Sequence, residues 1–167
     1  MHAHALRHIL LKALAFGVIS CLFVHCANRA ENCIYLIPKG FTGNVVIVFG
    51  QKNGEQIEYK NEKRLYRIPE NGVLKTKFQK KYGIANMYFL RESSLKENDT
   101  IKYMNPADWN NIKLDSSKIA VWNLQSGNKL IGKEKVHFEL LTIGQIKKSD
   151  SISNLRSNFM WSILDSL

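Results

Sequence analysis

Short apolar runs separated by turn residues fill most of the sequence after Cys33, and this pattern constrains the fold more than any other feature. The runs are rich in β-branched and aromatic side chains, which favour strands over helices. Some of them alternate polar and apolar residues, as a strand with one exposed face does. The predicted strands are 34–37, 44–49, 56–59, 63–68, 73–78, 86–91, 100–104, 118–124 and 135–143. So many short strands with frequent turns predict a mainly β chain, folded as a single antiparallel β-sandwich or a partly open barrel.

Two of the predicted turns share one motif. Segments 35–38 and 66–69 both have the order Tyr-x-Ile-Pro, and a glycine follows each of them, at Gly40 and Gly72. Proline presets φ for the first corner of a turn, and glycine accepts positive φ further on. We therefore expect the same strand-exit turn at two matching corners of one sandwich. A separate signal, Asn53-Gly54, predicts a type I′ hairpin, because both central residues of that turn need positive φ.

The segments around these two turns resemble an uncharacterised domain family that occurs in lipoproteins and secreted proteins of Bacteroidetes and some other bacteria. The residues that carry the resemblance are 34–48 and 67–76. It covers residues 33–91 and, at its longest, reaches the strand at 135–143, whereas residues 92–133 are not covered. The resemblance implies an exported bacterial protein with a β-fold, and it supplies no catalytic residues.

The last part of the sequence, residues 149–167, has helical rather than strand periodicity. Its apolar residues recur at helical spacing: Ile152, Leu155, Phe159, Ile163 and Leu167. Ser149, Asp150 and Ser151 are candidate N-caps. We expect one amphipathic C-terminal helix that packs on a sheet face. Binding of an anionic membrane is poorly supported, because Arg156 is the only basic residue on the polar face.

The first residues are typical of a secretory signal peptide. Arg7 and Lys12 precede an uncharged apolar run at 13–24, and no acidic residue precedes that run. Its twelve residues are short for a membrane span, which needs roughly 20. We therefore predict an exported protein of the cell envelope, on the periplasmic side or at the outer membrane. The predicted segments are a signal peptide at 1–20 (alternatively 1–25), a tether at 21–32, a β-domain at 33–148 and the helix at 149–167.

Two cysteines that directly follow the alternative cleavage sites are candidates for lipid attachment. Residues 18–21 resemble the lipobox of bacterial lipoproteins, with the small Ser20 before Cys21. Cys26 is the alternative: its apolar run has a more usual length, but His25 is a poor residue before a cleavage site. Acyl chains such as palmitate on either cysteine would anchor the protein, and more than one chain is needed for stable binding. The membrane is therefore the first predicted partner.

The choice between these cysteines decides what Cys33 does. If Cys21 carries the lipid, Cys26 and Cys33 remain as a pair that could form a small disulfide loop in an oxidising compartment. If Cys26 carries it, Cys33 is a lone thiol at the start of the first strand. Both alternatives stay open at the level of the sequence.

The sequence after the signal peptide contains little that points to catalysis. His137 is its one histidine, so neither a zinc site of His and Cys nor any other metal or cofactor is predicted. His137 and Glu139 share a strand face and could serve as a base and its orienting carboxylate in an exported enzyme. We favour the simpler interpretation, two polar residues on a solvated face of a protein that is not an enzyme.

Charge supplies the last signal, since the chain carries a formal net charge of +10. Basic residues concentrate at 60–81, where we predict a candidate anion-binding patch. Its members are Lys63, Arg64, Arg67, Lys75, Lys77, Lys80 and Lys81. Such a patch would suit an anionic ligand, an acidic polysaccharide or an acidic protein partner, whereas nucleic acid is not expected for an exported protein. A solvated basic face is the alternative. The sequence as a whole predicts an envelope lipoprotein with a binding or structural role.

Overall fold

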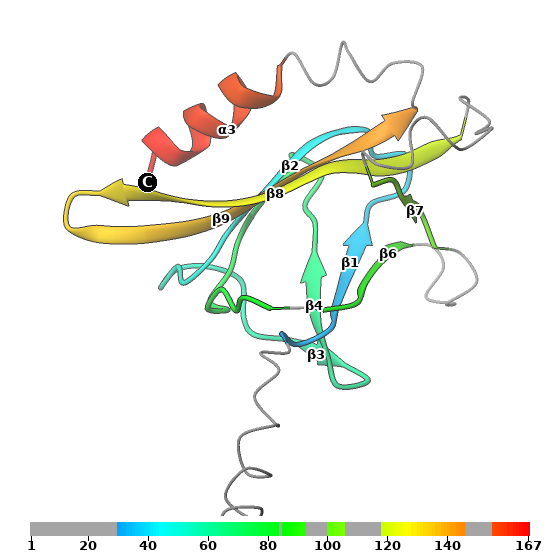
Figure 1. Cartoon of the computed structure of the whole chain (residues 1–167), viewed down its shortest axis with the longest axis horizontal. Coiled ribbons are helices and arrows are strands. Elements are labelled where there is room, and N and C mark those ends of the chain that lie inside the picture. The colour runs from blue at the N-terminus through cyan, green and yellow to red at the C-terminus, as the bar shows by residue number, and fades with distance from the viewer. Residues whose placement is uncertain (1–29, 84, 93–99, 106–117, 146–154) are drawn as a thin grey trace, which may run out of the picture.

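The computed structural model describes residues 30–83, 85–92, 100–105, 118–145 and 155–167 (Figure 1). The strands are β1 (Cys33–Ile37), β2 (Gly43–Val48), β3 (Tyr59–Lys60), β4 (Lys63–Arg67), β5 (Val73–Lys75), β6 (Met87–Arg91), β7 (Lys102–Tyr103), β8 (Ile119–Ile131) and β9 (Glu134–Gln145), and the helix is α3 (Arg156–Asp165). One sheet has the order β3-β4-β1-β6, and the other has the order β5-β2-β9-β8-β7. Each strand range predicted from the sequence overlaps one of these strands.

The mainly β fold is confirmed, but its strand pairing differs from the expected antiparallel one. Antiparallel pairs join β3 to β4, β2 to β9 and β8 to β9. Parallel pairs join β1 to β4 and β6, β2 to β5, and β7 to β8. Both sheets are therefore mixed, and they do not close into a barrel. The chain crosses from one sheet to the other after β1 and again after β4, and such crossovers let neighbouring strands run parallel.

The two Tyr-x-Ile-Pro segments form the matching corners that their sequences predict. The first carries the chain from β1 to β2, and the second carries it from β4 to β5. Tyr35 lies opposite Tyr66 in the parallel pair β1–β4, and β2 and β5 are again parallel neighbours. Gly40 and Gly72 have φ values of 78° and 75°. The same strand–turn–strand unit thus occurs twice, side by side, across the two sheets.

The prediction of a type I′ hairpin at Asn53-Gly54 is wrong. β2 pairs with β5 and β9 rather than with β3, and the φ of Gly54 is not positive. Glycine is needed there for another reason, since a Cβ atom would lie 2.8 Å from the backbone of Lys75. A two-residue turn with positive φ occurs instead at Asn61 and Glu62, which join β3 to β4.

The second sheet lies between the first sheet and α3 (Figure 1). Apolar residues form a layer on each of its two sides. Between the sheets lies the main core, which includes Ile47 and Leu141. On the opposite face, α3 packs through Phe159, Ile163 and the buried Leu164. Leu155 and Leu167 are exposed. The helix begins at Arg156, and its contact face differs from the expected stripe by including Leu164. The candidate N-caps Ser149, Asp150 and Ser151 lie outside the described residues.

Residues that face the space between the sheets change from polar to apolar along three strands. The rows are Cys33, Tyr35 and Ile37 on β1; Arg64, Tyr66 and Ile68 on and after β4; and Glu139, Leu141 and Ile143 on β9. Their polar members all line one pocket. The interior therefore has an apolar end and a polar end, and β1 begins at the polar end.

Candidate ligand-binding pocket

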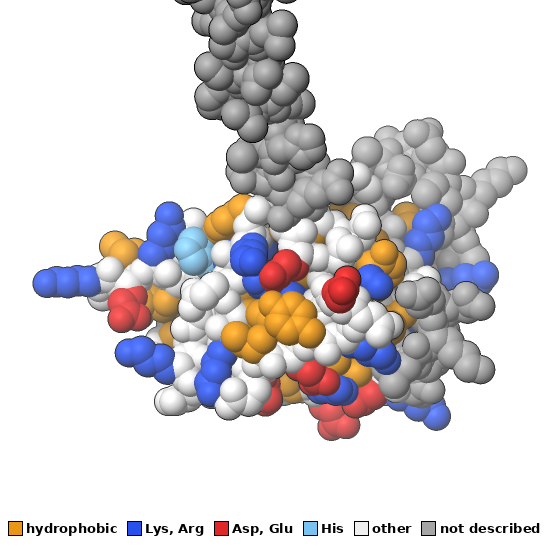
Figure 2. All heavy atoms as spheres, turned by 90° about the horizontal axis from the view of Figure 1, so that it is seen from below, with side chains coloured by type: hydrophobic (Ala, Val, Ile, Leu, Met, Phe, Trp, Pro, Cys, Tyr) orange, Lys and Arg blue, Asp and Glu red, His pale blue; other side chains and the backbone are white. Residues whose placement is uncertain are grey.

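The polar end of the interior contains a pocket of about 160 Å³. Its lining includes five charged residues: Glu31, Arg64, Lys80, Lys81 and Glu139. Figure 2 views the molecule from the side on which β1 begins. On this side basic and acidic side chains lie beside one another, and they do not form a patch of a single charge. The pocket thus holds opposite charges in two groups, one inside it and one at its rim.

The inner group is an ion pair between Lys80 and Glu139. Their side chains are only 10% and 8% exposed. The Tyr35 hydroxyl donates to Glu139 Oε2 over 2.9 Å, and the Ser126 hydroxyl lies 3.4 Å from Oε1. Burial, followed by the charge of Glu139, raises the pKa of Tyr35 well above its usual value. The phenol therefore stays protonated at neutral pH and remains a donor to the carboxylate.

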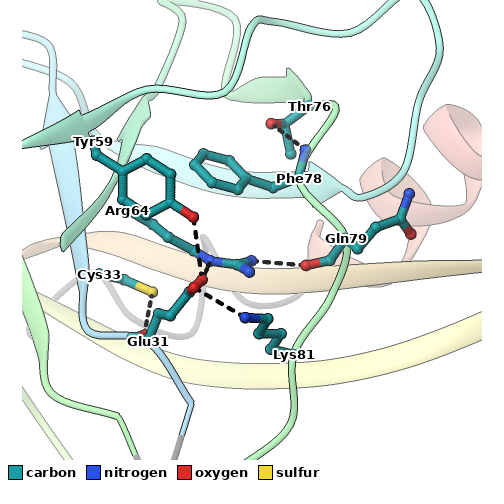
Figure 3. Close-up of polar contacts among 8 residues, drawn as sticks. All are labelled: Glu31, Cys33, Tyr59, Arg64, Thr76, Phe78, Gln79 and Lys81. Carbon is teal, nitrogen blue, oxygen red and sulfur yellow. Dashed lines mark hydrogen bonds and ion pairs between the residues drawn. The ribbon is translucent and has the colours of Figure 1, made fainter. Parts of the chain in front are cut away.

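The rim group has Glu31 at its centre (Figure 3). Arg64 Nε donates to Glu31 Oε2, and the Tyr59 hydroxyl lies 3.4 Å from the same oxygen. Lys81 Nζ donates to Oε1 over 2.9 Å. These hydrogen bonds from Lys81 and Arg64 lower the pKa of Glu31. The carboxylate is thus held ionised by donors from three separate segments of the chain.

Arg64 is fixed in place by contacts other than the one with Glu31. Its Nη1 donates to the carbonyl of Gln79 over 2.7 Å, and its guanidinium lies 4.7 Å from the centre of the Phe78 ring. Phe78 is positioned in turn by its own N–H, which donates to Thr76 Oγ1 over 3.2 Å (Figure 3). Burial would lower the pKa of Arg64, but its contacts with Tyr66 and Glu31 outweigh that effect and raise it. The result is a buried, permanently charged cation aimed at the rim.

Cys33 lies beside these groups as a free thiol. Its Sγ donates to the Glu31 carbonyl over 3.2 Å. Burial, with a smaller contribution from the charge of Glu139, raises the pKa of the thiol to about 11. Cys21 and Cys26, the candidate lipid sites, lie outside the described residues. Lipid attachment and the Cys26–Cys33 disulfide therefore stay predictions.

Residues 29–134, more than half of the chain, match a family of unknown function, DUF6843. The chain belongs to the DUF6843 family. This supports the predicted resemblance at the level of a family without an assigned function, and the matched region includes residues 92–133, which the resemblance left uncovered.

The DUF6843 chain is also similar to one solved structure, that of a putative lipoprotein from Bacillus anthracis. The two chains are 19% identical, and they superpose with a TM-score of 0.48 over 70% of this chain and 72% of the other. No curated protein matches the sequence.

The structure separates the two residues that the sequence suggested as a base and its carboxylate. The carboxylate of Glu139 is buried and bound by Lys80 and Tyr35. His137 Nδ1 is hydrogen-bonded to the Tyr82 hydroxyl over 2.7 Å, at an exposed position. The interpretation of both as residues of a solvated face is therefore wrong for Glu139, because a charged side chain can be buried when it is paired.

The seven residues of the predicted anion-binding patch do not lie on one face of the DUF6843 domain. Arg64, Lys80 and Lys81 line the pocket, where each contacts a carboxylate. The other four lie elsewhere. Arg67 forms a two-point ion pair with Glu58, and Lys63 lies 5.0 Å from the centre of the Tyr88 ring. Lys75 borders a second groove, and Lys77 follows β5. Three of the seven thus belong to the candidate site.

The sequence did not single out Glu31 or Tyr35, although both belong to the polar end. Glu31 lies in the predicted tether, where nothing local marks it, and Tyr35 looks like an ordinary strand residue. Among the described residues, no group of three His, Cys, Asp or Glu side chains is arranged to hold a metal ion. No helix in the described part of the chain has the length and apolar character that crossing a bilayer requires.

Proposed function

We propose that this DUF6843 protein is an exported lipoprotein of the cell envelope whose β-domain binds a small ligand. The observation that carries the binding role is the pocket of about 160 Å³, whose charged groups are held in place by neighbouring residues. Glu31, at the rim of this pocket, lies in the segment predicted to be the tether. A ligand bound there would lie next to the point where the domain joins its anchor.

We propose binding rather than catalysis as the role of the pocket. The enzymatic interpretation needs Glu139 as the carboxylate that orients His137. Glu139 is instead bound by Lys80 and Tyr35, and His137 Nδ1 is hydrogen-bonded to the Tyr82 hydroxyl. An enzyme that uses His137 is therefore the less favoured alternative.

Binding of a polyanion is a second candidate. The observation that favours it is a groove of about 360 Å³ bordered by Lys52 and Lys75, whose lining shares no residue with that of the pocket. Glu134 also lines this groove, so its charge is mixed. We rank this candidate below the pocket for that reason.

The anchor is tested by labelling cells that express the full-length protein with radioactive palmitate. We expect label in the wild type, and loss of label in either Cys21→Ala or Cys26→Ala, whichever removes the acylated residue. The intact mass of the native protein would give the cleavage site and the lipid together. Label that persists in the double variant, or a native protein that begins at Met1, would overturn the anchor.

A further inference from the structure

The rim of the pocket has the donor arrangement of a carboxylate receptor. Tyr59 on β3, Arg64 on β4 and Lys81 beyond β5 come from three segments and converge on the two oxygens of Glu31 (Figure 3). Lys81 contacts Oε1 of Glu31, whereas Arg64 and Tyr59 contact Oε2. Charged donors on both oxygens make strong and directional contacts with a carboxylate.

The position of Arg64 does not depend on Glu31 alone. Arg64 is anchored by the Gln79 carbonyl and the Phe78 ring, on the side away from Glu31. Lys80, the third cation of the pocket, is bound to Glu139. The three cations of the pocket face two carboxylates, so one positive charge is left over, and removal of the Glu31 carboxylate would leave two. An anion that replaced Glu31 would therefore meet an Arg64 guanidinium that is already in place, together with the charge of Lys81.

The space next to the receptor fits a small molecule with an apolar body. A cavity of roughly 150 Å³ is large enough for benzene, and this pocket measures about 160 Å³. Besides the charged groups, its lining includes Cys33, Met87 and Leu124. A short hydrocarbon body would contact these side chains while its carboxylate faced Arg64 and Lys81.

We propose that Arg64, Lys81 and Tyr59 form the binding site for a small carboxylic acid with a short apolar body, and that Glu31 occupies this site as a built-in substitute for the ligand. The inference rests on the proposed binding role and names the class of ligand. Glu31 competes as an intramolecular group, with an effective concentration in the millimolar range. An external acid must displace it, so removal of its charge strengthens binding of the acid.

The test is a calorimetric titration of the purified full-length protein with butyrate at fixed ionic strength. We expect the Glu31→Gln variant to bind butyrate at least about tenfold more tightly than the wild type, since its internal competitor is gone. Glu58→Gln is the matched control: it frees Arg67 from an equally direct ion pair outside the pocket, and its affinity for butyrate should equal that of the wild type. Butyramide, the uncharged analogue, should not bind either variant measurably.

A second substitution checks that the gain comes from the rim. Lys81 is 56% exposed, so Lys81→Gln leaves the fold intact, unlike replacement of the buried Arg64. In the Glu31→Gln background it should return butyrate affinity to the wild-type level or below. Equal affinity of wild type and Glu31→Gln, or equal binding of butyramide, would overturn the inference. Palmitate labelling is independent of this result. If the protein is labelled but Glu31→Gln does not bind butyrate more tightly, the carboxylate site alone is overturned. If Glu31→Gln binds butyrate more tightly but the protein is not labelled, only the anchor is overturned.

Discussion

The two ends of the interior are enclosed by the same strands but are held together by different forces. At the apolar end, Ile37, Val45 and Ile143 are completely buried and contact other hydrocarbon side chains. At the polar end, Lys80 and Glu139 are nearly as deeply buried and interact through charge. Hydrocarbon burial is non-directional, whereas a buried ion pair stabilises only with good geometry and full hydrogen bonding.

The buried ion pair makes the polar end, rather than the apolar end, the candidate for a binding function. Replacing a buried ion pair with hydrocarbon side chains of similar volume is often neutral or stabilising. The fold alone therefore has no need of Lys80 and Glu139 at the polar end. Charged groups that are kept in a pocket at some cost in stability are candidates for binding. In this respect the pocket differs from the rest of the core.

The largest expected effect comes from breaking the inner pair on one side. In Glu139→Ala, the buried Lys80 ammonium and the Tyr35 hydroxyl both lose their partner. We expect the free energy of unfolding to fall by about 4 kcal/mol, measured by urea denaturation. The double substitution Lys80→Met with Glu139→Leu should recover most of this loss, because no unpaired charge remains.

Leu141→Ala is the matched control at the apolar end. Leu141 is fully buried two residues further along β9, and its truncation should cost about 3 kcal/mol. Lys80→Met should not recover that cost, in contrast to the cost of Glu139→Ala. A loss below about 1 kcal/mol for Glu139→Ala would contradict a buried ion pair between Lys80 and Glu139.

The second effect is on the reactivity of Cys33. Burial and the nearby Glu139 raise the pKa of this thiol from 9.0 to about 11. Because the thiolate is the nucleophile, alkylation by iodoacetamide at pH 8 should be about 100-fold slower in the folded protein than in urea. The measurement is quantitative mass spectrometry of the Cys33 peptide after reduction. Equal rates in the two states would show that the thiol is not enclosed by the polar end.

Much of the fold could be predicted because its signals are local. The strands and the C-terminal helix follow from residue type and spacing within short windows, and the two Ile-Pro turns follow from the backbone limits of proline and glycine. Pairing direction could not be predicted, because it depends on which distant strands become neighbours. β1 lies between β4 and β6, and no local pattern contains that arrangement.

The candidate site was less predictable than the fold for the same reason. Glu139 is 104 residues from Tyr35 and 59 residues from Lys80. From sequence alone a glutamate in an alternating strand is assigned to solvent, since glutamate is rarely buried unless it is paired. The three basic residues of the site were recognised by charge, but their carboxylate partners were not. Composition shows that cations are present, and only the tertiary structure shows which are paired.

The third effect concerns the rim pair, which is more exposed than the inner pair. Hydrogen bonds from Lys81 and Arg64 lower the pKa of Glu31 below 4.5. The ionised carboxylate therefore stabilises the fold above the unfolded-state pKa, and this stabilisation is lost as the pH falls through the lower folded-state pKa. At pH 7, Glu31→Gln should lower the free energy of unfolding by about 1 kcal/mol.

The pH profile distinguishes this rim contribution from a general effect of the substitution. The difference between wild type and Glu31→Gln should shrink as the pH falls below 4.5 and the wild-type carboxyl becomes protonated. Urea denaturation at a series of pH values measures it. A difference that stays constant down to acidic pH would mean that the charge of Glu31 does not contribute.

The smallest effect is expected for basic residues outside the pocket. Lys75 and Lys77 belong to the predicted anion-binding patch but do not line the pocket. Changing both to Glu should alter the free energy of unfolding by no more than about 0.5 kcal/mol. It should also lower only slightly the salt concentration that elutes the protein from a sulfated resin, because exposed charges are screened within about 10 Å at 0.1 M salt. Lys39→Glu with Lys118→Glu, at two exposed positions that line neither the pocket nor the groove, is the control for the same loss of net charge. If the Lys75 and Lys77 changes abolished retention while the control did not, the polyanion surface would replace the pocket as the principal binding site, and the paired cations of the polar end would be structural.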